Sequence, residues 1–141
     1  MKKNILFLCT GNSCRSQMAE GFGKKYFGGI YNIYSAGIEK HGMNQNAIKV
    51  MSEKGIDLSS HSSKTLEDIG RILFNYVFTV CGHANENCPI FLGKAKVIHV
   101  GFSDPPKLAQ GLTDEEEILK HYRRVRDEIE NFAKNLTTYL D

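Results

Sequence analysis

The chain of 141 residues has little net charge and no long apolar run, and each absence excludes a class of protein. Its formal net charge of +2 at pH 7, with basic residues mixed among acids, is too mild for a nucleic-acid-binding surface. The apolar stretch from Ile5 to Leu8 is too short for a membrane span or a signal peptide. We therefore expect a cytoplasmic protein that binds neither nucleic acid nor membranes.

Linkers, internal repeats and low-complexity segments are also absent, so nothing in the sequence marks a domain boundary. The length allows one hydrophobic core that needs neither a disulfide nor a metal ion to support it. We expect a single domain over residues 1–141 that acts as a monomer.

Closely spaced cysteines are missing as well. The four cysteines are Cys9, Cys14, Cys81 and Cys88. Zinc sites favour pairs that are two to four positions apart, and no two of these cysteines are that close. Structural disulfides are rare in the cytosol. The cysteines therefore indicate chemistry or packing, and we expect no metal site.

Short runs rich in β-branched and aromatic residues predict strands at residues 4–9, 30–35, 76–81 and 95–100. Helical periodicity lies between and after them. A first helix follows residue 16 with Met18, Phe22 and Tyr26 on one face and ends at Gly28-Gly29, and a second spans residues 44–54 with Ala47, Ile48 and Met51 on one face.

The last helix has the clearest pattern. Thr113 and Glu116 predict a capping box, and the acidic run from residue 114 to 117 suits the positive end of a helix dipole. An apolar stripe follows at spacings of three and four, which is typical of a core face: Ile118, Tyr122, Val125, Ile129, Phe132, Leu136 and Leu140.

Strands that alternate with helices predict an α/β fold, an open parallel four-stranded sheet flanked by helices. Ligands of such sheets bind at the carboxyl ends of the strands. Cys9 and Cys81 end predicted strands, and Asp104 comes shortly after the fourth. We expect these reactive side chains to meet at one edge of the sheet.

The segment between the first strand and the first helix has the composition of an anion-binding loop. It reads Cys9-Thr10-Gly11-Asn12-Ser13-Cys14-Arg15-Ser16. Backbone N–H groups gather at such a helix N-terminus and bind anions. The same groups, the helix dipole and the charge of Arg15 should lower the pKa of the Cys9 thiol, which makes Cys9 the predicted nucleophile.

Each position of this loop has an expected role. The backbone from Thr10 to Arg15 surrounds a tetrahedral oxyanion, and the Arg15 guanidinium binds two of its oxygens. Ser16 can donate a hydrogen bond to the Cys9 thiolate. Asn12 tolerates a left-handed backbone, and Gly11 lets the backbone approach the ligand closely.

The loop from Cys9 to Ser16, together with Asp104-Pro105, resembles the low-molecular-weight protein tyrosine phosphatase superfamily. This resemblance implies a phosphatase-like fold. It also implies that Asp104 is the general acid that protonates the leaving oxygen.

Ester hydrolysis needs no second or third thiol, yet Cys81 ends the third predicted strand and Cys88 follows it. Their spacing places them roughly on one side of a helix, where partial unwinding brings the sulfurs together. A relay follows. Cys9 forms an adduct with a reducible oxyanion, Cys81 attacks the Cys9 sulfur, and Cys88 attacks Cys81 by thiol–disulfide exchange.

This arrangement resembles the thioredoxin-coupled arsenate reductases, which have the phosphatase fold and the same cysteine triad. The resemblance covers nearly the whole chain. Beyond the loop it rests on Met18-Ala19-Glu20-Gly21, Tyr34-Ser35-Ala36-Gly37-Ile38-Glu39, His41-Gly42, Cys81, Cys88-Pro89, Gly101-Phe102, Asp104-Pro105 and residues 124–129. It implies reduction of arsenate to arsenite with thioredoxin as the electron donor, and a Cys14 that takes no part in the redox steps.

Two positions depart from this family: Ser103, where an acidic residue often precedes the general acid, and Lys64. Members that bind potassium beside the loop use asparagine, glutamate, serine and aspartate side chains. Asn12, Glu20 and Ser35 match, but Lys64 stands where the aspartate would be. A lysine ammonium can replace the cation because it offers a fixed positive charge to the same oxygens. This argues against bound potassium, and we expect no cofactor.

Two other classes of function remain open from the residues. A phosphomonoester hydrolase would need Cys9, Arg15 and Asp104 but neither Cys81 nor Cys88. A thiol sensor or metal module would need cysteines but not the pairing of Arg15 with Asp104. We therefore favour an arsenate reductase, with weak phosphatase activity because phosphate and arsenate have nearly the same shape.

Overall fold

The computed structural model describes residues 2–80 and 95–140, and the strands in this part of the chain form one parallel sheet. The strands are β1 (Lys3–Cys9), β2 (Tyr31–Gly37), β3 (Tyr76–Thr79) and β4 (Lys96–His99). They lie in the order β2-β1-β3-β4, and every pairing is parallel. The predicted α/β class and four-stranded sheet are confirmed.

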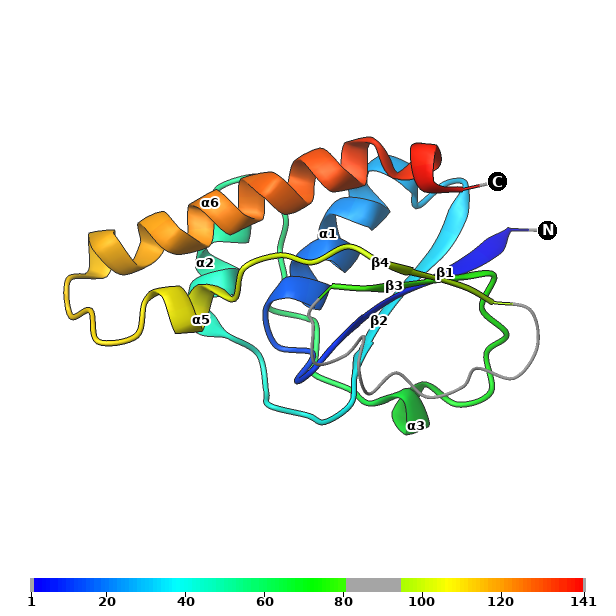
Figure 1. Ribbon diagram of the computed structural model, residues 1–141, viewed down its shortest axis with the longest axis horizontal. Coiled ribbons are helices and arrows are strands. Elements are labelled where there is room, and N and C mark those ends of the chain that lie inside the picture. Colours follow the sequence, from blue (N-terminus) through cyan, green and yellow to red (C-terminus); the bar gives the residue numbers. More distant parts are fainter. Residues whose placement is uncertain (1, 81–94, 141) are drawn as a thin grey trace.

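Helices follow the strands along the chain. They are α1 (Arg15–Phe27), α2 (Gln45–Ser52), α3 (Leu66–Ile69), α5 (Pro105–Leu108), α6 (Glu115–Lys134) and the 3-10 helix η1 (Leu136–Tyr139). The long α6 packs against α1 and α2, and Figure 1 shows α3 on the opposite side of the strands from α6. Within the described residues, no helix combines the length and apolar character needed to cross a bilayer.

The central strand β1 is covered on both faces. Ile5 to Leu8 are completely buried, as expected for a continuous apolar run in a parallel sheet. The rings of Phe7 and Phe78 pack 5.7 Å apart, and each contacts the ring of Phe132 from α6. The apolar stripe of the last helix is therefore a core face, as predicted.

The start of α6 corrects one prediction. Its N-cap is Asp114, whose carboxylate accepts a hydrogen bond from the N–H of Glu117, so the predicted capping box of Thr113 and Glu116 is wrong. The two alternatives have the same spacing, shifted by one residue, and aspartate caps a helix as well as threonine does. The acidic first turn, Glu115 to Glu117, lies at the positive end of the helix dipole as expected.

The end of α6 also differs from the prediction. The helix stops at Lys134, Leu136 is buried in η1, and Leu140 lies beyond both. The C-cap Asn135 has a backbone outside the helical region, with φ of −103° and ψ of 18°. A 3-10 helix repeats every three residues, so apolar residues at a spacing of three or four fit it as well as they fit the end of an α-helix. The apolar pattern alone therefore did not mark the end of α6.

Other boundaries move by one to several residues. The second strand runs from Tyr31 to Gly37 instead of residues 30–35, because its pairing continues until Gly37 faces Cys9, and Ile30 is exposed. In α2 the buried residues are Ala47, Val50 and Met51, and Ile48 is partly buried against the core. Helices α3 and α5 were not predicted, since four residues are too few to show a helical period.

Replacement of Asp114 by alanine tests the corrected helix start. We expect D114A to lower the free energy of unfolding by about 1 kcal/mol, because an orphan N–H of the first turn loses its acceptor. Urea unfolding followed by circular dichroism measures the change. Thr113→Ala is the matched control, with an expected effect within about 0.5 kcal/mol. A larger loss in T113A than in D114A would contradict the assignment.

Candidate active site

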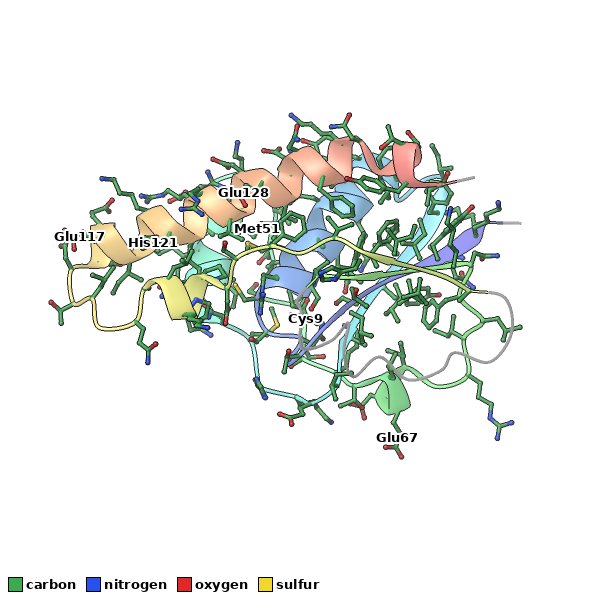
Figure 2. The ribbon with its side chains drawn as sticks, viewed as in Figure 1. Cys9, Met51, Glu67, Glu117, His121 and Glu128 are labelled. Carbon is green, nitrogen blue, oxygen red and sulfur yellow. The ribbon has the colours of Figure 1, made fainter. Side chains whose placement is uncertain are left out.

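A tight loop joins β1 to α1 and begins at Cys9, the last residue of β1. Cys9 is 4% exposed, and Figure 2 shows it in the interior of the molecule, whereas Glu67 projects from α3 at the surface. Arg15 is the first residue of α1, and Cys14 is its N-cap. The predicted sequence of strand, loop and helix is therefore present.

Each backbone carbonyl from Cys9 to Cys14 accepts a hydrogen bond from a residue outside this loop. The backbone carbonyl of Cys9 accepts from Ile38 N–H, that of Thr10 from Glu39 N–H, and that of Gly11 from both His41 N–H and Ser63 Oγ. The carbonyl of Asn12 accepts from Gln17 Nε2, that of Ser13 from Asn44 N–H, and that of Cys14 from Met18 N–H. The N–H and C=O of a trans peptide point in opposite directions. Carbonyls drawn outward therefore turn the N–H groups toward the centre of the loop.

Asn12 holds the loop from behind. Asn12 has a left-handed backbone with a φ of 49°, as predicted, and the whole residue is buried. Its Nδ2 donates to Ser16 Oγ at 2.9 Å and to Ser35 Oγ at 3.0 Å, while its Oδ1 accepts from Gln17 Nε2 and from the N–H of Lys64, both at 2.9 Å. Asn12 and Ser16 thus stabilise the loop, and neither lines the pocket described below.

Two glycines allow close packing here. A Cβ atom on Gly37 would lie 2.8 Å from both the nitrogen of Asn12 and the carbonyl oxygen of Thr10, so glycine lets the end of β2 approach the loop. A Cβ on Gly11 would lie 2.2 Å from the ring of His41. The structure therefore gives Gly11 a packing role against His41, and the close approach to a ligand expected from the sequence stays a prediction.

A pocket of about 620 Å³ opens at the carboxyl end of β1. Its lining residues are Cys9, Thr10, Gly11, Ser13, Cys14, Arg15, Glu39, His41, Asp104, Pro106 and Lys107. The predicted nucleophile, guanidinium and acid are therefore brought together at the expected edge of the sheet. Cys81 and Cys88 lie outside the described residues.

The guanidinium of Arg15 is held by two groups. Nη1 donates to the carbonyl of Phe102 at 3.0 Å, and Nη2 lies 3.6 Å from Asp104 Oδ1. In the described part of the chain, its Nε is a buried nitrogen without a hydrogen-bond partner. Leaving such a donor unpaired costs about 1–3 kcal/mol, and more for a charged group. An oxyanion in the pocket would supply the acceptor that this nitrogen lacks.

The two cysteines of the loop differ in expected reactivity. Burial raises the pKa of the Cys14 thiol to about 12, although the nearby charge of Arg15 acts in the opposite direction. Cys14 is therefore protonated at neutral pH, which supports the expectation that it takes no part in redox chemistry. The lowered pKa of Cys9 stays a prediction, as does the hydrogen bond from Ser16 to its thiolate.

Three ionisable side chains at the pocket were not assigned from residue patterns. His41 Nε2 lies 2.7 Å from Glu39 Oε2, both at the pocket, and Lys107 comes from α5. The resemblance placed His41 near the loop, but no periodicity marks Glu39 or His41, since they lie between β2 and α2. Lys107 follows Asp104 by three positions, which is about one helical turn. This spacing is the sequence signal that could have placed Lys107 on the same side of the chain as Asp104.

Metal-ligating groups do not gather at this site. Within residues 2–80 and 95–140, no three histidine, cysteine, aspartate or glutamate side chains lie close enough together to hold a metal ion.

Comparisons with known proteins agree with this geometry. The family model of low molecular weight phosphotyrosine protein phosphatases matches residues 4–141. An arsenate reductase of Halalkalibacterium halodurans is 51% identical over 140 residues, covering 99% of this chain and 96% of that protein. An arsenate reductase of Bacillus subtilis is 50% identical over 132 residues, covering 94% and 93% of the two chains.

Solved structures show the same fold. An arsenate reductase in the phosphate-binding state superposes with a TM-score of 0.80 at 29% identity and covers 99% of both chains. A low molecular weight protein tyrosine phosphatase from T. tengcongensis superposes with a TM-score of 0.73 at 25% identity, covering 99% of this chain and 100% of that one.

The Nε of Arg15, which has no hydrogen-bond partner in the part of the chain that the structure describes, leads to a test with inorganic phosphate. We expect Arg15→Lys to weaken phosphate binding roughly tenfold to a hundredfold, because lysine lacks the planar group that donates two hydrogen bonds to one anion. The rise in thermal stability with phosphate concentration measures the dissociation constant. Arg124→Lys, an exposed position on α6, should bind like the original protein. Equal affinity in R15K would contradict the assignment.

Proposed function

Because this chain belongs to the low molecular weight phosphotyrosine protein phosphatase family, we propose that its anion pocket carries out the reduction of arsenate to arsenite. The observation that carries the proposal is the buried Nε of Arg15, which has no acceptor among residues 2–80 and 95–140 and lies at a pocket that also contains Cys9 and Asp104. Arsenate fits this chemistry because it is a tetrahedral oxyanion. The identity of about one half to enzymes named arsenate reductase supports this substrate over a phosphate ester.

The first step forms a bond between sulfur and arsenic. The Cys9 thiolate attacks arsenic(V), and one oxygen leaves as water after accepting a proton. Asp104 lines the same pocket and lies 3.6 Å from Arg15, so its carboxyl group is near enough to act as the general acid. Loop N–H groups and the Arg15 guanidinium stabilise the negative charge on the remaining oxygens.

Electrons then pass through three cysteines. Cys81 attacks the Cys9 sulfur, and the electron pair of the sulfur–arsenic bond goes to arsenic, which leaves as arsenite. Cys88 attacks the Cys81 sulfur of the resulting Cys9–Cys81 disulfide and releases the Cys9 thiolate. The product is a Cys81–Cys88 disulfide outside the anion loop, which makes it the bond that a protein reductant must reach.

Thioredoxin is the proposed reductant, and it closes the cycle by reducing the Cys81–Cys88 disulfide. A reducing cytoplasm is the compartment in which such a cycle runs, because its thiols stay reduced. We propose that the enzyme works there as a monomer. The same pocket should hydrolyse phosphate esters slowly, since it holds phosphate in the same way.

Coupled turnover tests the reaction and its reductant together. We expect arsenate to drive NADPH oxidation in the presence of thioredoxin and thioredoxin reductase, and to do so much more slowly with a glutaredoxin system. NADPH absorbance and direct detection of arsenite measure the rate, and para-nitrophenyl phosphate measures the weak hydrolysis. Fast ester hydrolysis with no arsenite formed would contradict the proposed reductase activity and would indicate a phosphatase.

Cysteine variants test the relay. We expect Cys9→Ser, Cys81→Ser and Cys88→Ser each to abolish multiple turnovers, because each removes a sulfur that must be attacked or must attack. Cys14→Ser should keep most of the activity. C88S treated with arsenate should accumulate a Cys9–Cys81 disulfide, which peptide mapping by mass spectrometry detects. Normal turnover in C88S would refute the relay.

A further inference from the structure

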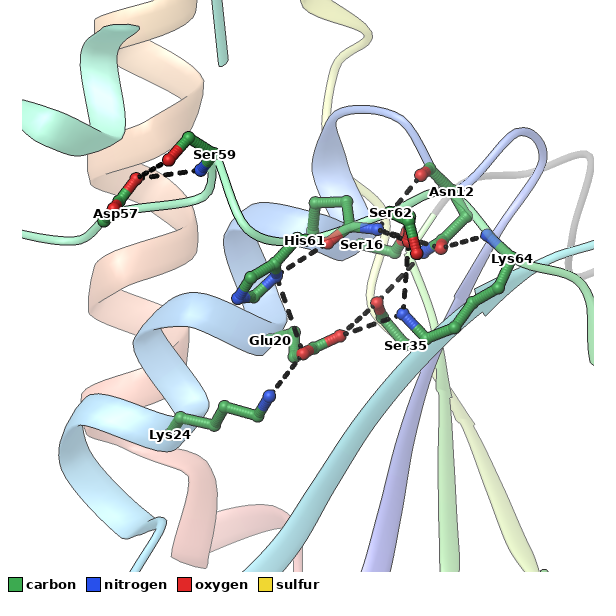
Figure 3. Close-up of polar contacts among 11 residues, drawn as sticks. Asn12, Ser16, Glu20, Lys24, Ser35, Asp57, Ser59, His61, Ser62 and Lys64 are labelled. Atoms are coloured by element: carbon green, nitrogen blue, oxygen red, sulfur yellow. Dashed lines mark hydrogen bonds and ion pairs between the residues drawn. The ribbon is translucent and has the colours of Figure 1, made fainter. Parts of the chain in front are cut away.

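A buried carboxylate lies behind the anion loop, on the side away from the pocket. Glu20 of α1 is 4% exposed, and one of its oxygens accepts from Lys24 Nζ at 2.6 Å. Its other oxygen accepts from Ser35 Oγ at 2.5 Å and lies 3.6 Å from Lys64 Nζ. Figure 3 shows Glu20 between Lys24 on one side and Ser35 and Lys64 on the other.

This carboxylate is connected to the loop by hydrogen bonds. Ser35 Oγ donates to Glu20 and accepts from Asn12 Nδ2 at 3.0 Å. Lys64 is tied to the same place by its backbone, because its N–H donates to Asn12 Oδ1 at 2.9 Å and its carbonyl accepts from Gly37 N–H at 2.8 Å. A displacement of Glu20 would therefore reach Asn12, whose left-handed backbone shapes the loop.

Three ionisable side chains surround Glu20. They are Lys24, Lys64 and His61, the last with Nδ1 at 3.6 Å from Glu20. Burial lowers the pKa of His61 more than Glu20 raises it, so His61 is neutral at pH 7. Burial also acts to raise the pKa of Glu20, but hydrogen bonds from Lys24 and Ser35 and the charge of Lys64 hold it below its usual value. Glu20 is therefore an anion neutralised by two ammonium groups.

A potassium ion does not fit among these groups. The residues that match the potassium-binding pattern of the family are Asn12, Glu20 and Ser35, and their side-chain oxygens already have partners. Asn12 Oδ1 accepts two hydrogen bonds, which uses both of its lone pairs. A further cation would also lie against the ammonium of Lys64, which costs free energy in a partly buried position.

We propose that the ammonium of Lys64 takes the place of a metal cation and positions the anion loop through Glu20, Ser35 and Asn12. Lys64 is a positioning residue, since its ammonium acts on the loop through Glu20 and is absent from the pocket lining. Oxyanion binding by this protein is therefore independent of potassium. The inference rests on the proposed function only in that arsenate is the anion the loop receives.

Phosphate binding in different salts tests this role. The original protein should bind phosphate equally well in the chlorides of potassium, sodium and tetramethylammonium. Lys64→Met should bind about tenfold more weakly in tetramethylammonium chloride, because loss of the ion pair leaves more negative charge on Glu20 behind the loop that receives the anion. Potassium should restore the affinity of K64M, because a small cation can pair with the Glu20 oxygen that the ammonium leaves and needs no ligand from Asn12, whereas tetramethylammonium is too large.

Two further variants separate positioning from a general loss of structure. Lys64→Arg keeps the charge and should retain most of the phosphate affinity without potassium. Lys49→Met removes a half-exposed lysine of α2 that pairs with Glu115. The phosphate affinity of this control variant should be the same in all three salts. Urea unfolding of each variant checks that it folds, and in arsenate turnover K64M should show a raised KM that potassium lowers.

The outcomes distinguish this inference from the proposed reaction. Unchanged phosphate affinity in K64M, or a weakened affinity that potassium does not restore, would overturn the role of Lys64. Potassium dependence in the original protein would do the same. A protein that shows the expected salt responses with phosphate but forms no arsenite would refute the reductase and leave the role of Lys64 standing.

Discussion

Hydrogen bonds from outside the anion loop are the constraint on which the rest of the site depends. The carbonyls from Cys9 to Cys14 are held by segments that follow β2 and by α1, so the opposite edges of the peptides face the pocket. Short polar residues alone would not hold such a loop, because their backbone groups can equally bond to water. The parallel pairing of β1 with β2 places the donors within reach, since Gly37 lies beside Cys9.

Charges of opposite sign lie on the two sides of this loop, and α1 supplies both. Arg15, at the start of the helix, faces the pocket with an unpaired Nε in the described structure, while Glu20 lies behind the loop. A buried carboxylate near an anion site would weaken anion binding if it were not neutralised. Lys24 and Lys64 neutralise it, so that the positive charge of Arg15 and the loop N–H groups dominate the pocket.

Much of the fold could be predicted from the sequence because local patterns of apolar residues indicate the strands and helices. The apolar run of β1, the face of Met18 and Phe22 on α1 and the stripe of α6 from Tyr122 to Phe132 are buried as expected. Errors occurred where a pattern fitted two registers equally well, as at Thr113 and Asp114, or where it was shorter than one period, as in α3 and α5. The extension of β2 to Gly37 depends on its partner strand, which no local pattern contains.

The sequence by itself determined the chemistry of the site, since a cysteine, an arginine and a glycine-containing loop between a strand and a helix specify an oxyanion and a nucleophile within a few consecutive residues. Only the tertiary structure decided which groups surround them. Asp104 meets Arg15 and His41 packs on Gly11 because separate segments converge at one sheet edge. Lys64 reaches Glu20 for the same reason: its position depends on backbone hydrogen bonds to Asn12 and Gly37, and distances between segments far apart in sequence are set by packing.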